Sequence, residues 1–498
     1  MSIYFRLSRI RLHPFFTDVL LTGVTQVLIL VTGLIMVSLV SKWMGLVALG
    51  EYLLLKRVSA WLLTGTQLGL GLALPREIAH TREESAERAS RYFAVAFVTI
   101  VPILAVMSLI AVLTAKTVAR LCFGSENRDL VYALVWLLAG SGLQTIVFGY
   151  YRGLQRMHYA NVVQLGGLVV VPLLVLVAIR SSHSAALLVE MTGIGLTAMS
   201  IVWSLPLFCK AKNFKSHFVS DAGRLLRYGV VRVPGDIANG ALLALGPVMV
   251  SHCASVEQLS YLLLGITCLG ITSLAFWPVV MMLLAKISKM LGMGRTEDVI
   301  IYVQHLRSAV VQLSVLVMTQ ALIFIGPLVR WWLGDSYLSG VPVICIIMLA
   351  IPGYMYFCAM RSVLDAASAI PYNTRSVILA LAVFCVISLT VTYAAPREWV
   401  LLWVSATMTI AFYVLAIATE WSLRAVKLVV QAPQMSPMLI VALLAFVSLS
   451  AQFAFHFEIT KTAFCLVLLF NVGLTLMLIR QSQPEWVTFM SRVALSRA

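Results

Sequence analysis

The residues with the clearest chemical potential are polar side chains placed inside apolar segments. Within 225–246, Arg232 and Asp236 are four residues apart and therefore share one face of a helix. Asn239 adds a third polar group about one turn further on. Charged groups at membrane depth are costly and normally face a protein interior or a wet cavity. We therefore predict that this helix lines an aqueous cavity, where Arg232 and Asn239 bind substrate and Asp236 acts in coupling or gating.

The same stretch carries Pro234-Gly235 between the two charged residues, which is expected to weaken the helix there. Broken backbone at membrane depth survives only where protein or water satisfies its polar groups. A second interpretation is that Arg232 and Asp236 form an intrahelical ion pair that anchors the helix at the membrane surface. The sequence leaves both interpretations open.

A pair of adjacent bases, Lys56 and Arg57, falls inside the apolar segment 48–74. On a helix Lys56 and Gln67 share one face, and Arg57 lies on the next. Such a pair could hold phosphate, Arg by a bidentate fork and Lys as a point charge. We predict that all three residues line a cationic, substrate-binding cavity. The alternative is that both bases extend to the outer interface, with Glu51 as their partner.

A second Arg-x-x-x-Asp spacing joins Arg361 to Asp365, and Arg152 with Arg156 takes the equivalent position in the first half of the chain. Bases near the inner interface commonly meet anionic headgroups or helix ends. We therefore predict that Arg152, Arg361 and Asp365 gate or stabilise the inner mouth of a cavity.

Carboxylates are rare within the apolar segments: Asp18, Glu190, Asp236 and Glu420. A transporter coupled to H⁺ or Na⁺ needs at least one carboxylate whose pKa can move. Asp236 is the best candidate by context, and Glu190 and Glu420 are interpreted as helix-end residues at the interface.

No enzyme site is recognisable. The sequence has no phosphate-binding P-loop, no HExxH and no nucleophile elbow, so an ATP-driven pump is excluded for this chain alone. The eight cysteines form no CxxC and have no histidines at metal spacing. We interpret them as small core residues and expect no disulfide, metal or cofactor.

Composition predicts the elements that must position these residues. Of 498 residues, 61% are hydrophobic and 11% are charged, whereas a soluble domain carries roughly 25% charged residues. The chain is therefore expected to be an all-α polytopic membrane protein. About 14 apolar segments are long enough to span a bilayer: 19–41, 48–74, 92–114, 130–149, 161–179, 187–208, 229–251, 259–284, 308–332, 341–363, 376–394, 399–421, 438–456 and 462–479.

The net charge of +16 would suggest nucleic acid in a soluble protein, but here the bases lie between apolar segments. If the N-terminus is cytoplasmic, about 26 of the 36 basic residues fall on the cytoplasmic side and about eight on the other. This bias predicts a multi-pass membrane protein with both termini in the cytoplasm, and no nucleic-acid partner.

Basic connections recur with an offset of about 210 residues between the halves, as in the pair Arg152 and Arg361. Six helices are therefore followed by six in the same orientation, the pattern of parallel repeats related by an axis along the membrane normal. We predict an N-lobe (1–209), a C-lobe (210–430) and an appendage with helices 13 and 14 (431–498). Two lobes about a crevice suit alternating access.

The chain resembles bacterial polysaccharide flippases of the Wzx type, within the superfamily that also holds multidrug exporters and lipid II flippases. The strings that carry the resemblance are SKWMGLVALGEYLLL (41–55), GLGLALPREIA (69–79), YYRGLQRMHYAN (150–161), LLRYGVVRVPGDIAN (225–239) and MRSVLDAASAIPYN (360–373). The resemblance implies two six-helix bundles forming a V. It also implies transport of an undecaprenyl-pyrophosphate-linked oligosaccharide to the outer leaflet, with Lys56, Arg57 and Arg232 on the pyrophosphate and anionic sugars.

The partners implied are the lipid-linked oligosaccharide, membrane lipids and a polysaccharide polymerase complex, and the energy source is open between Na⁺, H⁺ and the membrane potential. A cation-coupled multidrug exporter is the main alternative function, and a non-transporting membrane scaffold is a distant one. The charge of the cavity separates the first two: a positive cavity favours an anionic lipid-linked substrate, and a negative one favours cationic drugs.

Overall fold

A computed structural model describes residues 14–429, apart from 82–85, 212–213, 295, 369 and 395, and describes residue 473 alone beyond them. Within these residues the chain is all helical, which confirms the predicted class. Ten helices are long and apolar enough to cross a membrane, and a bent pair of shorter helices makes an eleventh span. The predicted helices 13 and 14 lie outside the described residues.

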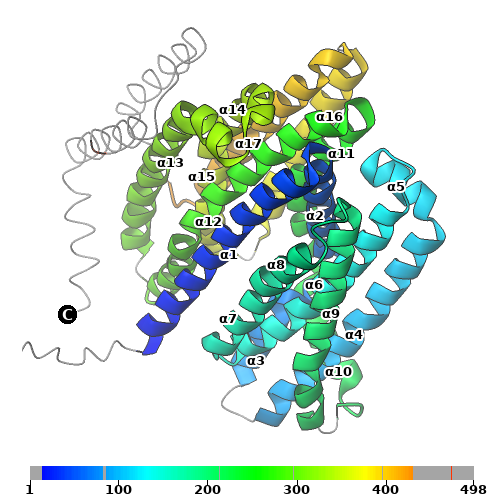
Figure 1. Cartoon of the computed structure of the whole chain (residues 1–498). Helices are drawn as coiled ribbons and strands as arrows, with labels where there is room; N and C mark the ends of the chain where they lie inside the picture. The colour runs from blue at the N-terminus through cyan, green and yellow to red at the C-terminus, as the bar shows by residue number, and fades with distance from the viewer. Residues whose placement is uncertain are drawn as a thin grey trace, which may run out of the picture.

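The first half of the chain forms one group of helices (Figure 1). Their bounds are α1 (Pro14–Met44), α2 (Leu46–Thr66), α3 (Leu70–Thr81), α4 (Ala86–Leu113), α5 (Ala115–Phe123), α6 (Asp129–Gly153), α7 (Met157–Leu165), η1 (Gly166–Val170), α8 (Val171–Ala178), α9 (Ala185–Lys210) and α10 (Phe218–Val230). Of these, η1 is a single π-helical turn that joins α7 to α8 within one span. The predicted segments 1 to 6 all correspond to helices or broken helices here.

The second half forms the other group. Its elements are α11 (Val233–Cys253), α12 (Val256–Gly292), α13 (Thr296–Trp332), η2 (Asp335–Gly340), α14 (Val341–Met348), α15 (Ile351–Ala367), α16 (Tyr372–Ala394), η3 (Arg397–Trp399) and α17 (Val400–Ala425). The predicted segment 341–363 is bent by 45° between α14 and α15.

Two features of the first half differ from the prediction. The segment 48–74 is not one helix, because Leu68 and Gly69 have φ of 47° and 73°, a left-handed conformation that ends α2 before α3 begins. The polar link after α9 contains α10, whose apolar face packs against α3 and α4. Asp221 and Leu225 on that face are buried, so α10 is an amphipathic helix and not a loop.

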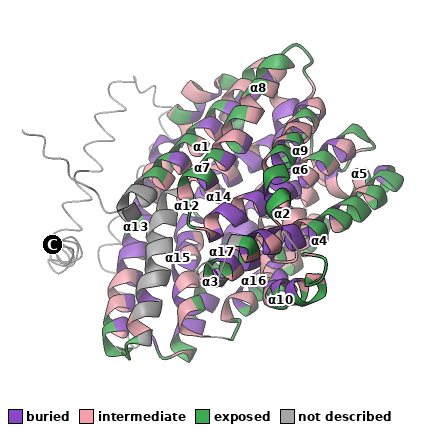
Figure 2. Cartoon of the chain, turned by 90° about the horizontal axis from the view of Figure 1, so that it is seen from below, coloured by how far each residue is buried: buried purple, intermediate pink, exposed green. Residues whose placement is uncertain are grey.

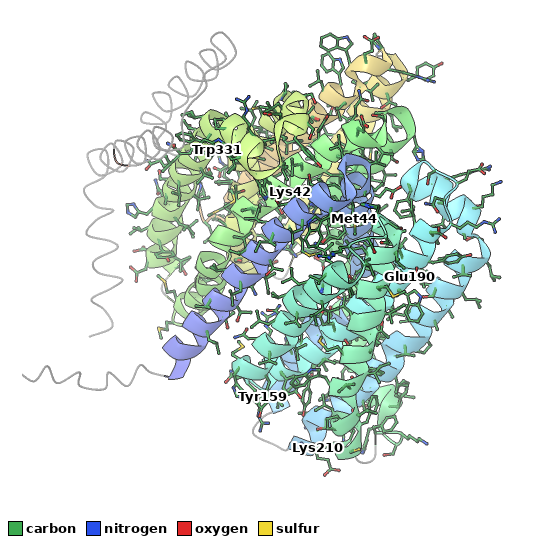
Figure 3. The ribbon with its side chains drawn as sticks, viewed as in Figure 1. Lys42, Met44, Tyr159, Glu190, Lys210 and Trp331 are labelled. Atoms are coloured by element: carbon green, nitrogen blue, oxygen red, sulfur yellow. The ribbon has the colours of Figure 1, made fainter. Side chains whose placement is uncertain are left out.

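The connections that hold most of the described basic residues gather at one end of the bundle, which we call the basic end. It includes Arg152 in the last turn of α6, Lys210 at the end of α9 and Arg232 before α11. Figure 3 shows Lys210 and Tyr159 at the lower end of the first group, and Lys42 at the far end of α1.

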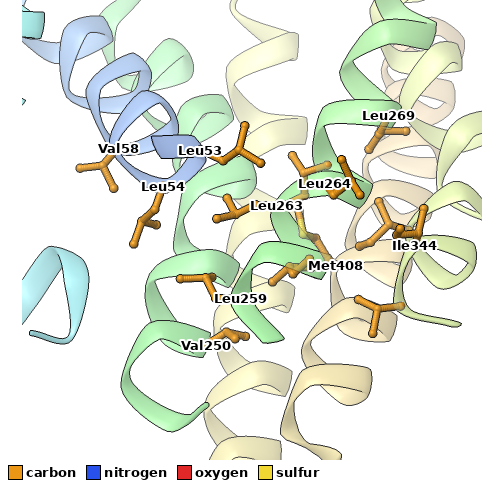
Figure 4. Close-up of a cluster of buried hydrophobic side chains, with 14 of the residues drawn as sticks. Leu53, Leu54, Val58, Val250, Leu259, Leu263, Leu264, Leu269, Ile344 and Met408 are labelled. Atoms are coloured by element: carbon orange, nitrogen blue, oxygen red, sulfur yellow. The ribbon is translucent and has the colours of Figure 1, made fainter. Parts of the chain in front are cut away.

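The apolar core is shared at one end of the molecule and divided at the other. Away from the basic end, a single cluster joins both groups of helices, with α2 packed against α11 and α12. Figure 4 shows Leu53 of α2 on the side of its helix toward Leu263 and Leu264 of α12. Toward the basic end, one cluster belongs to α3, α4, α6 and α10 and a separate one to α13, α15 and α17.

Large apolar side chains cover much of the outer surface. Leu109, Ile110 and Leu113 of α4 are 52–75% exposed, and Val386 and Leu389 of α16 are 63–66% exposed. In Figure 2 the outer helices are green along such faces, while the centre is purple. Apolar faces of this extent are what a bilayer covers.

A charged network is buried in the second group. The Arg307 side chain is fully buried, its Nε donates to the Tyr356 hydroxyl at 3.1 Å and its Nη2 donates to Glu420 Oε1 at 2.5 Å. Tyr356 and Arg424 also donate to Glu420. The prediction that Glu420 is a simple helix-end residue at the interface is therefore wrong, because its carboxylate joins α13, α15 and α17.

We expect Glu420→Gln to destabilise the protein by about 3–5 kcal/mol, because it leaves the buried Arg307 without its counter-charge. Unfolding of the purified protein in mixed micelles containing SDS measures this loss. Arg424→Gln is the matched control, since Arg424 binds the same carboxylate from the surface and its removal should cost less than about 1 kcal/mol. Equal stability of Glu420→Gln and the wild type would contradict the role of this network.

Candidate functional site at the seam between the lobes

We call the first group, α1 to α10, the N-lobe and the second, α11 to α17, the C-lobe, which counts α10 with the N-lobe although the predicted boundary is at residue 209. The two lobes meet along α2 and α11. Trp61 Nε1 donates a hydrogen bond to the Ile237 carbonyl oxygen at 3.2 Å. Opposite Trp61 stands Gly240, where a Cβ atom would lie 2.9 Å from the indole ring. At the other end of the seam, Ser260 Oγ donates to the Leu46 carbonyl oxygen at 2.9 Å. The seam is closely packed along its length.

At the basic end, the backbone of the α2–α3 break lies directly against the backbone at the end of α10. A Cβ atom on Gly69 would lie 2.5 Å from Gly229 Cα, and one on Gly229 would lie 2.4 Å from the Leu68 carbonyl oxygen. Only glycine allows this approach between the α2–α3 break and the end of α10. The contact holds α10 against the N-lobe just before the chain turns into α11.

The predicted residues of α2 lie in different surroundings. Lys56 is exposed, and its Nζ donates to the hydroxyl of Tyr52 at 3.4 Å, so its nearest partner is on its own helix. Arg57 is half-buried and interacts electrostatically with Tyr354 of α15, across the seam. Gln67 ends α2, and its side chain folds back over Gly71. The structure does not bring these three side chains together.

A polar stripe on α15 leads from the neighbour of Arg57 toward the basic end. Tyr354, Cys358, Arg361 and Asp365 are spaced by four, three and four residues, so they follow one face of the helix. The last two residues of the stripe reach a pocket between α11, α15 and α16. Tyr354 therefore stands between the α2 cation and that pocket.

The pocket is organised by one guanidinium between two carboxylates. Arg361 Nη2 donates to Asp236 Oδ1 at 3.0 Å, and its Nε lies 3.9 Å from Asp365 Oδ2. Asn373 of α16 fixes this arrangement, because its Nδ2 donates to Asp365 Oδ1 at 2.8 Å and to the Arg361 carbonyl oxygen at 3.0 Å. The pair Asp236–Arg361 joins the first helix of the C-lobe to α15.

The pocket has a volume of about 210 Å³. Five of the nine residues predicted for the site line it: Arg232, Asp236, Asn239, Arg361 and Asp365. The other four are elsewhere, with Lys56, Arg57 and Gln67 on α2 and Arg152 at the end of α6. Their roles in binding, coupling or gating stay predictions.

The local structure around Arg232 differs from the expectation. The helix begins at Val233, so Arg232 is its N-cap and Pro234 occupies the first turn, where proline is tolerated. The expected interruption between Arg232 and Asp236 is therefore wrong. Among the described residues no salt bridge joins these two side chains, because Asp236 pairs with Arg361 instead.

The guanidinium of Arg232 lies over an aromatic ring from the other lobe. Its Cζ is 4.8 Å from the centroid of the Tyr228 ring on α10, and Arg76 Cζ of α3 is 4.0 Å from the same centroid. Arg76 also contacts Glu77 at 3.5 Å. Two cations thus share one ring where the lobes meet at the basic end.

Sequence reasoning missed Arg76, Tyr228, Tyr354 and Asn373. The strings quoted above contain Arg76 and Asn373. Tyr354, Cys358 and Arg361 follow one another at intervals of four and three residues, which is the spacing of one helix face. Tyr228 also lies in one of these strings (225–239), four residues before Arg232, but its contact with Arg76 depends on the fold of α10 against α3.

We expect a double-mutant cycle on Asp236→Asn and Arg361→Gln to give a coupling energy of about 0.5–3 kcal/mol, since either substitution leaves the remaining charged side chain without its partner. SDS unfolding of the four proteins measures it. The same cycle on Asp335→Asn and Arg330→Gln, an exposed pair at the far end of the protein, should give less than about 1 kcal/mol. Additive effects at Asp236 and Arg361 would show that the ion pair contributes nothing to stability.

No protein-family model and no curated protein matches this sequence. Solved structures do match its fold. The lipid II flippase MurJ in an inward closed conformation gives a TM-score of 0.71 at 12% identity, over 95% of this chain and 100% of that one. An inward-facing multidrug resistance MATE family transporter of the MOP superfamily gives 0.62 at 10%, over 81% and 98%. A eukaryotic MATE transporter gives 0.59 at 10%, over 87% and 98%. The chain therefore has the transporter fold that is seen in MurJ and in MATE proteins.

Proposed function

We propose that this protein flips a polyprenyl-pyrophosphate-linked oligosaccharide from the cytoplasmic to the periplasmic leaflet of the inner membrane. The observation that carries the proposal is the pair of guanidinium groups, Arg76 and Arg232, over the Tyr228 ring at the meeting point of the lobes. Guanidinium groups bind phosphate oxygens in bidentate geometry. A diphosphate carries the charge that this pair would attract.

The substrate makes such a site necessary. A pyrophosphate with several sugars cannot cross about 30 Å of hydrocarbon without a polar path. The half-buried Arg57, the polar stripe of α15 and the ion pair at Asp236 supply polar groups along the seam. The polyprenyl chain needs no such path, because it is as apolar as the membrane.

The arrangement of the core supports alternating access from the basic end. The lobes share one apolar cluster away from that end and have separate clusters near it. Separating the lobes at the basic end therefore disturbs less apolar packing than separating them at the other end. The excess of bases supports a cytoplasmic position for the basic end, where a lipid-linked oligosaccharide would be loaded.

A cation-coupled multidrug exporter is the second candidate, favoured by the likeness to MATE transporters. An organic cation would need a carboxylate that is not already neutralised. Asp236 and Asp365 both lie against Arg361, which favours the anionic substrate. In either case we propose that release of Asp236 from Arg361 is the coupling step, driven by H⁺, Na⁺ or the membrane potential. Arg152 is proposed to act at the cytoplasmic mouth, and a polysaccharide polymerase complex is the proposed acceptor of the product.

Deletion of the gene should cause a lipid-linked glycan to accumulate in the cytoplasmic leaflet, and mass spectrometry of the lipid extract identifies it. Complementation with Arg232→Ala or Arg57→Ala should restore normal protein abundance but less than a tenth of the surface polysaccharide, because the cationic path is broken. Arg120→Ala is the control and should complement fully. Arg120 lies on α5 away from the basic end, where hydrogen bonds from Arg120 and then Lys116 hold the pKa of Glu126 below its usual range. Wild-type export from Arg232→Ala would remove Arg232 from the path.

The aromatic ring between the two guanidinium groups can be tested separately. Tyr228→Phe keeps the ring and should retain most of the export, whereas Tyr228→Leu should lower it about threefold to thirtyfold, as expected for loss of a cation–π contact of about 0.5–2 kcal/mol. Surface polysaccharide per molecule of transporter is the measure. If Phe and Leu behave alike, the contact with the ring face is irrelevant to transport.

A further inference from the structure

Two side-chain amides in the pocket between α11, α15 and α16 have acceptor atoms without a partner. Asn239 Oδ1 and Asn373 Oδ1 are buried, and neither receives a hydrogen bond from the described residues. Both residues line the pocket that holds Arg361. Buried polar atoms are almost always hydrogen-bonded, because an unmade bond costs free energy. The pocket therefore presents two acceptors that a bound donor would satisfy.

The charges of the pocket cancel. Arg232 and Arg361 supply two positive charges, and Asp236 and Asp365 supply two negative ones. A bare cation would have to compete with the Arg361 guanidinium, which already contacts both carboxylates. A free anion would be repelled by the same carboxylates. A neutral ligand whose groups both donate and accept hydrogen bonds meets neither obstacle, and the hydroxyl group is such a group.

The size of the pocket limits that ligand. Its volume of about 210 Å³ is below the range of roughly 300–1,000 Å³ that is usual for drug-sized ligands. A pocket of this size suits one sugar ring and not a whole oligosaccharide. The buried side chain of Phe357 forms part of one wall, which is apolar there.

We propose that this pocket binds the sugar attached directly to the diphosphate, as a neutral ring with several hydroxyl groups. The oxygens of Asn239 and Asn373 accept from its hydroxyl groups, and Arg232, which lines the same pocket and contacts Tyr228 at the seam, binds the adjoining diphosphate. This inference rests on the proposed function, since it places one part of the same substrate. It makes α11, α15 and α16 the elements that select the first sugar.

Binding of short soluble probes to the purified protein tests the proposal. The probes are farnesyl diphosphate and farnesyl diphosphate linked to N-acetylglucosamine, glucose or galactose, and native mass spectrometry gives each Kd. We expect at least one sugar-bearing probe to bind wild type about tenfold or more tightly than farnesyl diphosphate, as about one net hydrogen bond would give. Asn239→Ala with Asn373→Ala should abolish this increment while the protein still binds farnesyl diphosphate.

Two further variants complete the design. Arg232→Ala should weaken the binding of all probes by a similar factor, because it removes a contact to the diphosphate. Gln320→Ala, which removes a buried unpartnered amide oxygen of α13 outside the pocket, should keep the increment. A sugar increment that survives in the double Asn variant, or no increment with any of the three sugars, would overturn the pocket assignment while farnesyl diphosphate still binds.

Failure of the proposed function gives a different result. If no probe binds wild type, both the flippase proposal and the sugar pocket are wrong. If NaCl in place of choline chloride raises the Tm of wild type but not that of Asp236→Asn, the pocket is a cation site and the sugar assignment is wrong.

Discussion

The contact between α2 and α11 is the constraint on which the rest of this structure depends. Gly240 lets the Trp61 ring approach the helix axis, and Gly69 with Gly229 lets backbone meet backbone at the basic end. In a membrane, where apolar surface gains little by leaving lipid, such close packing and the Trp61 hydrogen bond are what hold two lobes together. The polar groups of the candidate site lie at this seam or on the helix faces next to it.

One guanidinium determines the electrostatic character of the C-lobe. Because Arg361 lies between Asp236 and Asp365, the lobe contains carboxylates without presenting a net negative site. The fully buried Arg307 does the same for Glu420 on the far side of α15. These carboxylates of the C-lobe are thus paired with arginines of the same lobe. Among the described residues, no carboxylate of the C-lobe forms a salt bridge with Arg57, Arg76 or Arg232.

The sequence predicted the membrane spans and the polar cluster better than it predicted which side chains pair with each other. Hydropathy located eleven of the first twelve spans, whereas 48–74 is broken into α2 and α3. The spacing of Arg232, Asp236 and Asn239 marked the start of one helix, and the spacing of Arg361 and Asp365 marked another helix. The pairing of Asp236 with Arg361 could not be predicted, because it joins residues 125 apart and depends on the crossing of α11 and α15. The α2–α3 break was missed because Leu68 is not a residue that usually adopts positive φ.

The junction between α10 and α11 has a mechanical consequence. Only Val231 and Arg232 separate the two helices, yet α10 is packed on α3 and α4 while α11 belongs to the opposite bundle. Two residues are too few to form a flexible linker. Any tilt of α11 must therefore move α10 or change the backbone angles of Val231 and Arg232. Under the proposed function, an anion that draws Arg232 away from Tyr228 would act on this joint directly, with no side chains between the bound group and the joint.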